Sequence, residues 1–297
     1  MNKPTLLLLS VVSAFYFSSC GHSDKSDELE VAAPAKTEEA KVSGGSETFF
    51  QLPSPGEMLT FIKMVGGRNN KNTSFLNPIS NQKNYADKKS KGLNFGIYSC
   101  DLSYCSVLEI GSEALKYFKA VKIMGDQIGV STAIKPEILA RIQANISVPE
   151  SLAVITDDVY FDSFEALEDG NQGPTLALVL AGGWLESIYI AINLAKYEPN
   201  SPVVERLADQ KYTLENLLEY LKRHEADAGV AAVKADFESL LAQFNAIKEQ
   251  ETTNTVKTKN PNEKTLAGGT ELVMTKEVYT AVVEKIKSIR NSYTLTN

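Results

Sequence analysis

The sequence predicts a mainly α protein, an irregular multi-helix bundle of antiparallel helix hairpins, with a small β-hairpin or a loop before the C-terminal helix. Two observations support this prediction. Apolar residues recur at steps of three and four through most of the second half of the chain, which is the spacing of one helix face. The breaks between these periodic stretches are short, and short connections place consecutive helices antiparallel. No fixed repeat length stands out, which argues against a regular solenoid.

The chain begins with MNKPTLLLLSVVSAFYFSSC, which has the pattern of an export signal. Its apolar run ends at Phe17 and is shorter than the ~20 residues of a membrane-spanning helix. Two serines then precede Cys20, and small residues directly before a cysteine resemble the lipobox of bacterial lipoproteins. This resemblance implies that residues 1–19 are a signal peptide and that Cys20 carries fatty acids such as palmitate. Each buried methylene of such a lipid would contribute ~0.8 kcal/mol to membrane binding. An ordinary cleaved signal peptide and an uncleaved anchor are the alternatives.

Residues 20–48 are expected to form a disordered tether. They are rich in Ser, Asp, Glu, Lys, Ala and Gly and cannot bury enough apolar surface to offset the entropy of ordering. The acidic stretch SDKSDELE resembles the export tag of surface lipoproteins of the Bacteroidetes. The expected location is the bacterial cell envelope, with the lipid in the outer membrane and the protein periplasmic or surface-exposed. Residues 49–297 are expected to fold as a single α-helical domain.

The first half of this domain carries residues typical of helix starts. A serine, a proline and a third-position glutamate precede the stretch MLTFIKMV, and two later prolines occupy first-turn positions. The expected helices of this half begin at or near Pro55, Tyr85, Ser112, Pro136 and Pro149.

The second half has clearer helical periodicity. The stretch TLENLLEYLKRH is expected to be a helix capped by Thr213, and an apolar stripe from Val230 to Ile247 indicates the next helix. The last helix should follow a cap at Thr275. Between these helices, residues 252–274 contain turn residues in NPNE and AGG, which are typical of a loop or β-hairpin. Two strands alone are marginal in water, so a hairpin should lie on the helices.

The segment PTLALVLAGGWLESIYIAINLA, residues 174–195, is nearly free of charge over the length of a membrane span. We predict a buried central helix instead of a second anchor, because Glu186 and two glycines lie in its middle. Its small residues would let a neighbouring backbone approach closely. A carboxylate on such a helix must find partners or shift its pKa. Glu186 is therefore either a paired structural residue or a functional acid.

The stretch GIYSCDLSYC, residues 96–105, raises the same question for Asp101. On a helix, Asp101 shares a face with apolar residues four positions away, so we expect it to be buried. One aspartate and two thiolates on different faces are too few ligands for a metal. A disulfide between Cys100 and Cys105 would need to span ~8–9 Å on a helix, beyond the roughly 7 Å limit. If the helix is interrupted there, the oxidising compartment of an exported protein would permit the disulfide.

The overall composition excludes some classes of function. The chain has 30 Lys+Arg against 37 Asp+Glu, a net charge of -7 and no basic run, so nucleic acid is not an expected partner. It has 2 histidines, too few for a histidine-based metal site. We find no phosphate-binding glycine loop, nucleophile elbow or Cys/His pair, and expect neither a metal nor a cofactor.

Several short motifs resemble those of a family of uncharacterised lipoproteins of the Bacteroidetes. They are LPSP, LNPISN, LNFGIYSCDLSY, LAGGWLESIY and IRNSY, and the resemblance spans essentially the whole folded part. It implies a lipoprotein with this fold, but the family has no known activity that could be transferred to this chain. The family pattern has small residues at positions 100 and 105, so no cysteine chemistry is expected there.

The candidate site is a polar spot on two adjacent central helices. Its residues are Tyr98, Asp101, Tyr104, Trp184 and Glu186. They are expected to form either a buried structural network, in which Asp101→Asn should cost stability, or a ligand pocket.

We expect a binding or interaction module, held on the membrane through Cys20, with an envelope protein as its partner. The alternative is a hydrolase that uses Asp101 and Glu186 as an acid/base pair. Carboxyls within about 10 Å of each other in an open cleft would favour the hydrolase. Side chains sealed beneath packed helices would favour the structural network.

Overall fold

The computed structural model describes residues 55–65, 71–252 and 269–295. These residues form nine α-helices, one 3-10 helix and a two-stranded antiparallel sheet, which confirms the predicted mainly α class. The elements are α1 (Pro55–Val65), η3 (Ile79–Asn84), α2 (Lys88–Val107), α3 (Gly111–Ile128), α4 (Pro136–Ala144), α5 (Pro149–Asp169), α6 (Gly173–Leu194), α7 (Pro202–Arg223), α8 (Ala228–Phe244), β1 (Lys248–Thr252), β2 (Gly269–Val273) and α9 (Lys276–Thr294). The predicted signal peptide, Cys20 and the tether lie outside the described residues.

Local sequence sets several of the helix starts. The side chain of Asp87 caps α2 by accepting a hydrogen bond from the N–H of Ser90 at 2.9 Å. Thr275 caps α9 as predicted. Pro136 and Pro149 stand in the first turns of α4 and α5, where the missing N–H of a proline leaves no hydrogen bond unmade.

The start of α7 differs from the prediction. Thr213 is not a cap but lies inside the helix, which begins at Pro202. The N-cap is Ser201, whose hydroxyl accepts a hydrogen bond from the N–H of Val204 at 3.4 Å. The prediction was wrong because the buried face of the helix continues on the N-terminal side, through Val204 and Leu207, and a threonine inside a helix costs only a few tenths of a kcal/mol.

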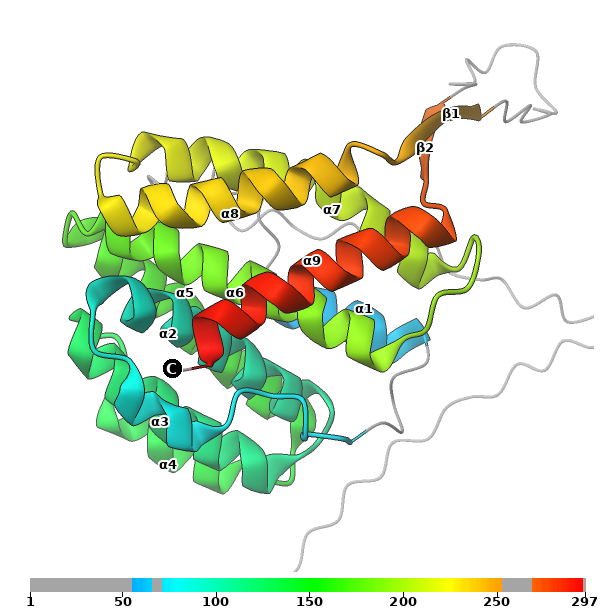
Figure 1. Cartoon of the computed structure of the whole chain (residues 1–297). Helices are drawn as coiled ribbons and strands as arrows, with labels where there is room; N and C mark the ends of the chain where they lie inside the picture. Colours follow the sequence, from blue (N-terminus) through cyan, green and yellow to red (C-terminus); the bar gives the residue numbers. More distant parts are fainter. Residues whose placement is uncertain (1–54, 66–70, 253–268, 296–297) are drawn as a thin grey trace, which may run out of the picture. The chain divides into compact units, whose positions relative to one another are not determined.

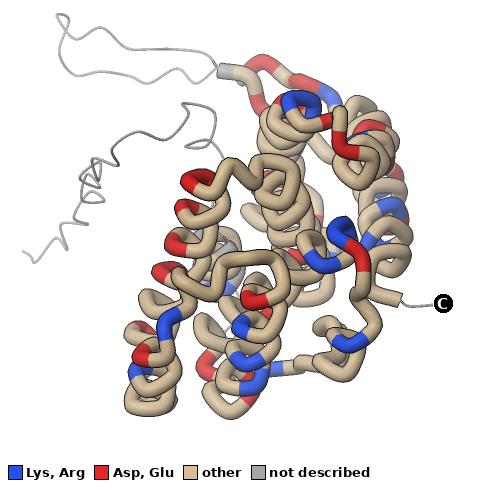
Figure 2. The backbone as a smooth tube through the Cα atoms, turned by 90° about the vertical axis from the view of Figure 1, so that its left-hand side faces the viewer, with Lys and Arg blue, Asp and Glu red and all other residues tan. Residues whose placement is uncertain are grey.

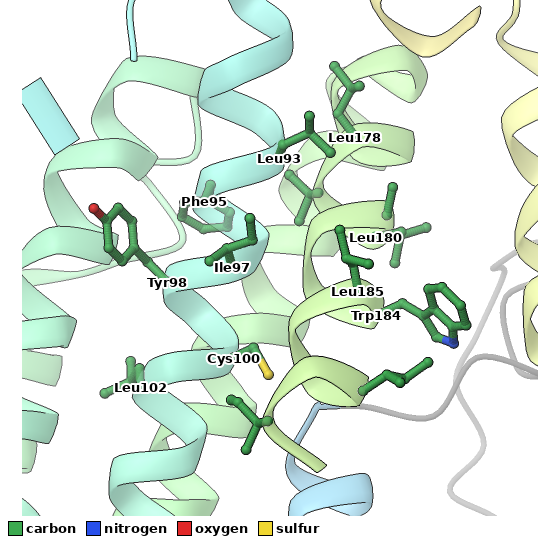
Figure 3. Packing of buried hydrophobic residues seen from close by; sticks show 14 of the residues in the cluster. Leu93, Phe95, Ile97, Tyr98, Cys100, Leu102, Leu178, Leu180, Trp184 and Leu185 are labelled. Carbon is green, nitrogen blue, oxygen red and sulfur yellow. The ribbon is translucent and has the colours of Figure 1, made fainter. Parts of the chain in front are cut away.

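Helices α2 and α6 pack directly against each other (Figure 3). Every residue from Gly92 to Val107 on α2 is buried. The two backbones approach closely because of glycines. A β-carbon on Gly182 would collide with the carbonyl oxygen of Leu93, and one on Gly96 would collide with the backbone of α6. This contact confirms the predicted role of small residues in the central segment.

Helix α6 is long and apolar enough to cross a membrane by length and composition, and no other helix in the described ranges is. However, 89% of its most apolar window is buried inside the fold. The surface that would face lipid in a membrane span instead faces other helices. The burial of α6 supports the prediction of a central helix.

Helices α7 and α8 form an antiparallel hairpin, and α9 lies against α8 and α6 (red in Figure 1). The predicted apolar stripe of α8 is buried at Val230, Val233, Phe237, Leu240 and Phe244. Figure 2 shows basic and acidic positions on the described helices, and both kinds occur on most of them, although α5 carries acidic residues and no lysine or arginine.

A small antiparallel sheet joins α8 to α9. Strand β1 pairs with β2, with Lys248 opposite Val273, so the predicted hairpin is confirmed, although β1 begins before residue 252. The sheet is anchored by the buried side chain of Leu272, and β2 contacts α7. Residues 253–268, which follow β1 and precede β2, lie outside the described residues.

Candidate functional site

Asp101 on α2 and Glu186 on α6 meet at the contact between the two helices. Both residues are fully buried, with 0% of their surface exposed, and the two carboxyls lie close enough for Glu186 to raise the pKa of Asp101. The sequence predicted each of them to be buried on its own helix. The structure brings them together because α2 and α6 approach closely at Gly96 and Gly182, about one turn before the two acids on each helix.

Arg290 on α9 neutralises one of these two carboxylates. Its Nε donates to Oε2 of Glu186 at 3.0 Å and its Nη2 donates to Oε1 at 2.9 Å. The guanidinium carbon lies 4.4 Å above the ring centre of Tyr189, and Nη2 also donates to the carbonyl of Phe75 at 3.3 Å. Such a two-bond pair is the strongest ionic contact that side chains form. It ties the last helix to the central one.

Asn77 is the centre of a second group of polar contacts. Its backbone N–H donates to Oδ2 of Asp101 at 3.2 Å. Its side-chain amide donates to the hydroxyl of Tyr85 at 3.0 Å and to Oδ1 of Asn94 at 3.1 Å. Asn94 in turn donates to the carbonyl of Tyr293 at 3.0 Å. These bonds hold the segment before α2, the helix α2 itself and the end of α9 in one network.

The tyrosines of the candidate site bond to backbone carbonyls and not to the carboxyls. Tyr98 donates to the carbonyl of Pro78 at 2.9 Å, and Tyr104 donates to that of Asn72 at 2.8 Å. Tyr117, which sequence reasoning did not single out, donates to the carbonyl of Asn77 at 3.2 Å. Burial raises the pKa of all three phenols, so they stay neutral and keep donating.

Trp184 does not join the other predicted site residues. Its indole N–H donates to Oε1 of Gln210 on α7 at 3.1 Å, and its ring packs on Phe237 of α8 with 5.5 Å between ring centres. In Figure 3 the side chains of Trp184 and Tyr98 extend from opposite sides of the α2–α6 pair. Trp184 therefore belongs to the packing between α6 and the α7–α8 hairpin.

The environment of Asp101 shifts its protonation. Burial raises its pKa well above the usual value, and the nearby Glu186 raises it further, while Arg290 and the N–H of Asn77 act in the opposite direction. Its Oδ1 accepts no hydrogen bond from any described group. Burial alone would lower the pKa of Arg290, but Glu186 outweighs burial and raises it, so Arg290 is a permanent cation.

The cysteines within the described ranges are free thiols. Cys100 and Cys105 are both buried on the uninterrupted helix α2, which agrees with the expectation that a helix cannot bridge them. Burial raises the pKa of both thiols well above the usual value, which removes their nucleophilic character. Among the described residues, no group of three or more His, Cys, Asp or Glu side chains could hold a metal ion.

Sequence reasoning missed the partners that complete the site. Arg290, Asn77, Asn94 and Tyr85 are all buried and all bond within the network. The motifs LNPISN and IRNSY contain Asn77 and Arg290, but neither motif indicates a role for these residues. The pairing of such distant segments leaves no periodic pattern in the sequence.

We compared the chain with family models, curated proteins and solved structures. No family model matches the chain, and no match was found among curated proteins or solved structures. The resemblance to Bacteroidetes lipoproteins therefore stays a prediction from the motifs.

Proposed function

We propose that this protein is a lipid-anchored lipoprotein of a bacterial envelope whose helical body acts as a binding or interaction module. The motif at Cys20 and the polar segment after it support the anchor. The observation that carries the choice of a module over an enzyme is the complete burial of Asp101 and Glu186. A catalytic carboxyl must reach within hydrogen-bonding distance of a substrate, whereas these two are enclosed by α2, α6 and α9.

The polar cluster then has a structural role that suits a module. It fixes the segment around Asn77 and the last turn of α9 against the central helices, through bonds to the carbonyls of Tyr293 and Thr294. These elements are far apart in the chain and would otherwise be joined only by apolar contacts. A rigid body of this kind presents a defined surface to a partner, which lowers the entropy cost of binding.

The anchor is tested by metabolic labelling of the cells that make the protein. Labelled palmitate is expected in the wild-type protein and absent from Cys20→Ala, which should also lose its membrane fraction. Cys100→Ala is the matched control, because a buried thiol on α2 is expected to accept no lipid. An unlabelled wild type, or label that survives Cys20→Ala, would sink the lipoprotein proposal.

The interaction role is tested separately by crosslinking in intact cells, followed by purification from envelope membranes. The expected result is a specific envelope protein recovered with the wild type. Cys20→Ala serves as the control, because it keeps the folded body but is no longer attached to the membrane. A partner recovered with both the wild type and Cys20→Ala therefore binds the folded body itself. Recovery of no specific partner with either form would contradict the module.

A further inference from the structure

Three charged groups meet where α2, α6 and α9 join, and their charges do not balance. Asp101 and Glu186 are two acids, and Arg290 is the one cation beside them within the described part of the chain. All three are buried, with Arg290 only 5% exposed. With both acids ionised, the site would hold one uncompensated negative charge in the protein interior, which is strongly unfavourable.

The hydrogen bonds indicate which acid is ionised. Both carboxylate oxygens of Glu186 accept from Arg290, at 2.9 and 3.0 Å, which is the geometry of an ionised carboxylate. Asp101 is different. Its Oδ2 accepts the N–H of Asn77, but Oδ1 has no donor among the described groups, and Glu186 lies close enough to this carboxyl to raise its pKa. A proton on Oδ1 turns this acceptor into a donor and satisfies the atom.

The other groups that face Asp101 cannot supply that donor. They are Tyr98, Cys100, Tyr104 and Cys105 on α2, Tyr117 on α3, Glu186 on α6 and Arg290 on α9. The three tyrosine hydroxyls donate to backbone carbonyls, and neither thiol forms a hydrogen bond to Oδ1 of Asp101. No side-chain hydrogen bond from Arg290 to Asp101 is formed, because its contacts run to Glu186, Phe75 and Thr294.

We propose that Asp101 carries a proton that it shares with Glu186 across the α2–α6 contact, and that this proton locks the packed core and is lost as the pH rises. Loss of the proton would place two adjacent carboxylates against a single guanidinium. The repulsion and the missing hydrogen bond would then weaken the joint between α2, α6 and α9. Because the protein is proposed to lie outside the cytoplasm, its core would respond to external pH.

The sign of the effect follows from linkage. Burial and Glu186 raise the pKa of Asp101 in the folded protein, whereas the unfolded chain has the ordinary value of about 3.9. The folded protein therefore holds one more proton than the unfolded chain between these two values. The stabilisation is complete below the unfolded pKa and is lost as the pH rises to the folded pKa. Across that window the unfolding equilibrium constant should rise about tenfold per pH unit.

The variant Asp101→Asn tests this directly, because an amide reproduces the protonated acid. Its NH2 can donate to Glu186 while its oxygen accepts from Asn77. Urea unfolding of the full chain is compared for the two proteins from about pH 5 to about pH 9. The ratio of the wild-type to the variant unfolding constant should rise by about tenfold per pH unit over part of that range. A ratio that stays flat throughout would overturn the proposal.

Infrared spectroscopy tests the proton without relying on a variant that must fold. In wild-type protein labelled with carboxyl-13C aspartate, a neutral carboxylic acid band is expected at neutral pH, where exposed aspartates are ionised. The band should disappear as the pH rises, and Asp101→Asn should lack it. Absence of a neutral aspartate band from the folded wild type would refute the proposal.

Discussion

The guanidinium of Arg290 and the carboxylate of Glu186 form a buried ion pair with two hydrogen bonds, across 104 residues of sequence. Removing one partner of such a pair leaves the other charge buried and uncompensated. We therefore predict that Arg290→Met loses about 3–5 kcal/mol in the free energy of unfolding, measured by urea denaturation.

The matched control for Arg290→Met is Lys116→Met. Lys116 forms an exposed pair with Glu113 at 2.7 Å on the surface of α3. Exposed pairs contribute little because water screens them and the side chains lose entropy, so the control should change stability by less than about 1 kcal/mol. Equal effects of the two substitutions would show that the buried pair is not a structural joint.

Gly182 limits the distance between α6 and α2. An alanine there would push its β-carbon into the carbonyl of Leu93, and rigid backbone cannot move aside as a flexible side chain can. Gly182→Ala should therefore lose about 1–3 kcal/mol, as overpacked cores do, despite a helix-propensity gain of up to about 1 kcal/mol. The measurement is the midpoint of urea unfolding, with an unchanged dependence of the unfolding free energy on urea concentration.

Gly229→Ala provides the comparison for Gly182→Ala. It is also a helical glycine, but an added β-carbon would lie 3.1 Å from Oδ1 of Asp227 and 3.1 Å from Cβ of Lys89, so these neighbours need to give by only a few tenths of an ångström. The overlap is much smaller than at Gly182, so the change should stay within about 1 kcal/mol of the wild type. A Gly182 variant as stable as the Gly229 variant would mean that α2 and α6 do not need this close approach.

The sequence predicted the helices and the burial of both acids, but only part of the candidate site. Asp101 shares a helix face with apolar residues, and Glu186 interrupts an apolar helix, so periodicity alone placed both in the core. Trp184 was grouped with Glu186 because it is close in sequence. Two residues along a helix are turned by roughly 200°, and the tryptophan faces α7 instead.

Arg290 continues the four-residue series of Val278, Val282 and Ile286, so periodicity indicates its burial, but nothing local in the sequence identifies Glu186 as its partner. Burial of Arg290 results from the packing of α9 on α6, which depends on the whole fold. The proximity of Asp101 and Glu186 could not be predicted from the sequence either. Their proximity also changes one expectation: Asp101→Asn was expected to cost stability in a structural network, whereas a shared proton makes the amide a close substitute.

Replacing Asn77 by alanine distinguishes the contribution of its side chain from that of its backbone N–H. In Asn77→Ala the hydroxyl of Tyr85 and the amides of Asn81 and Asn94 lose a partner, while the backbone N–H to Asp101 remains. The expected loss is about 2–3 kcal/mol, because buried polar groups are left unsatisfied. The pH dependence of unfolding should keep the wild-type slope, since the two carboxyls are untouched.

The control for Asn77→Ala is Asn145→Ala. Asn145 is partly exposed and donates one solvent-exposed hydrogen bond to the carbonyl of Arg141 at the end of α4. Water can replace that bond, so its loss should stay within about 0.5 kcal/mol. Urea unfolding at one pH gives the stabilities, and repeating it at a second pH gives the slopes. Stability of Asn77→Ala equal to that of the control would exclude Asn77 as the centre of the network.

The thiols of Cys100 and Cys105 should be unreactive in the folded protein. Burial excludes reagents from both side chains and raises their pKa, so little thiolate forms even in mildly alkaline solution. Native protein should therefore show no modification by a thiol reagent, and addition of urea should expose two reactive thiols per Cys20→Ala chain. Reductant should leave the urea midpoint unchanged, because no disulfide is present between them. Fast labelling without denaturant would show that the interior around Asp101 opens to solvent, and would return the two carboxyls to consideration as groups that can meet a substrate.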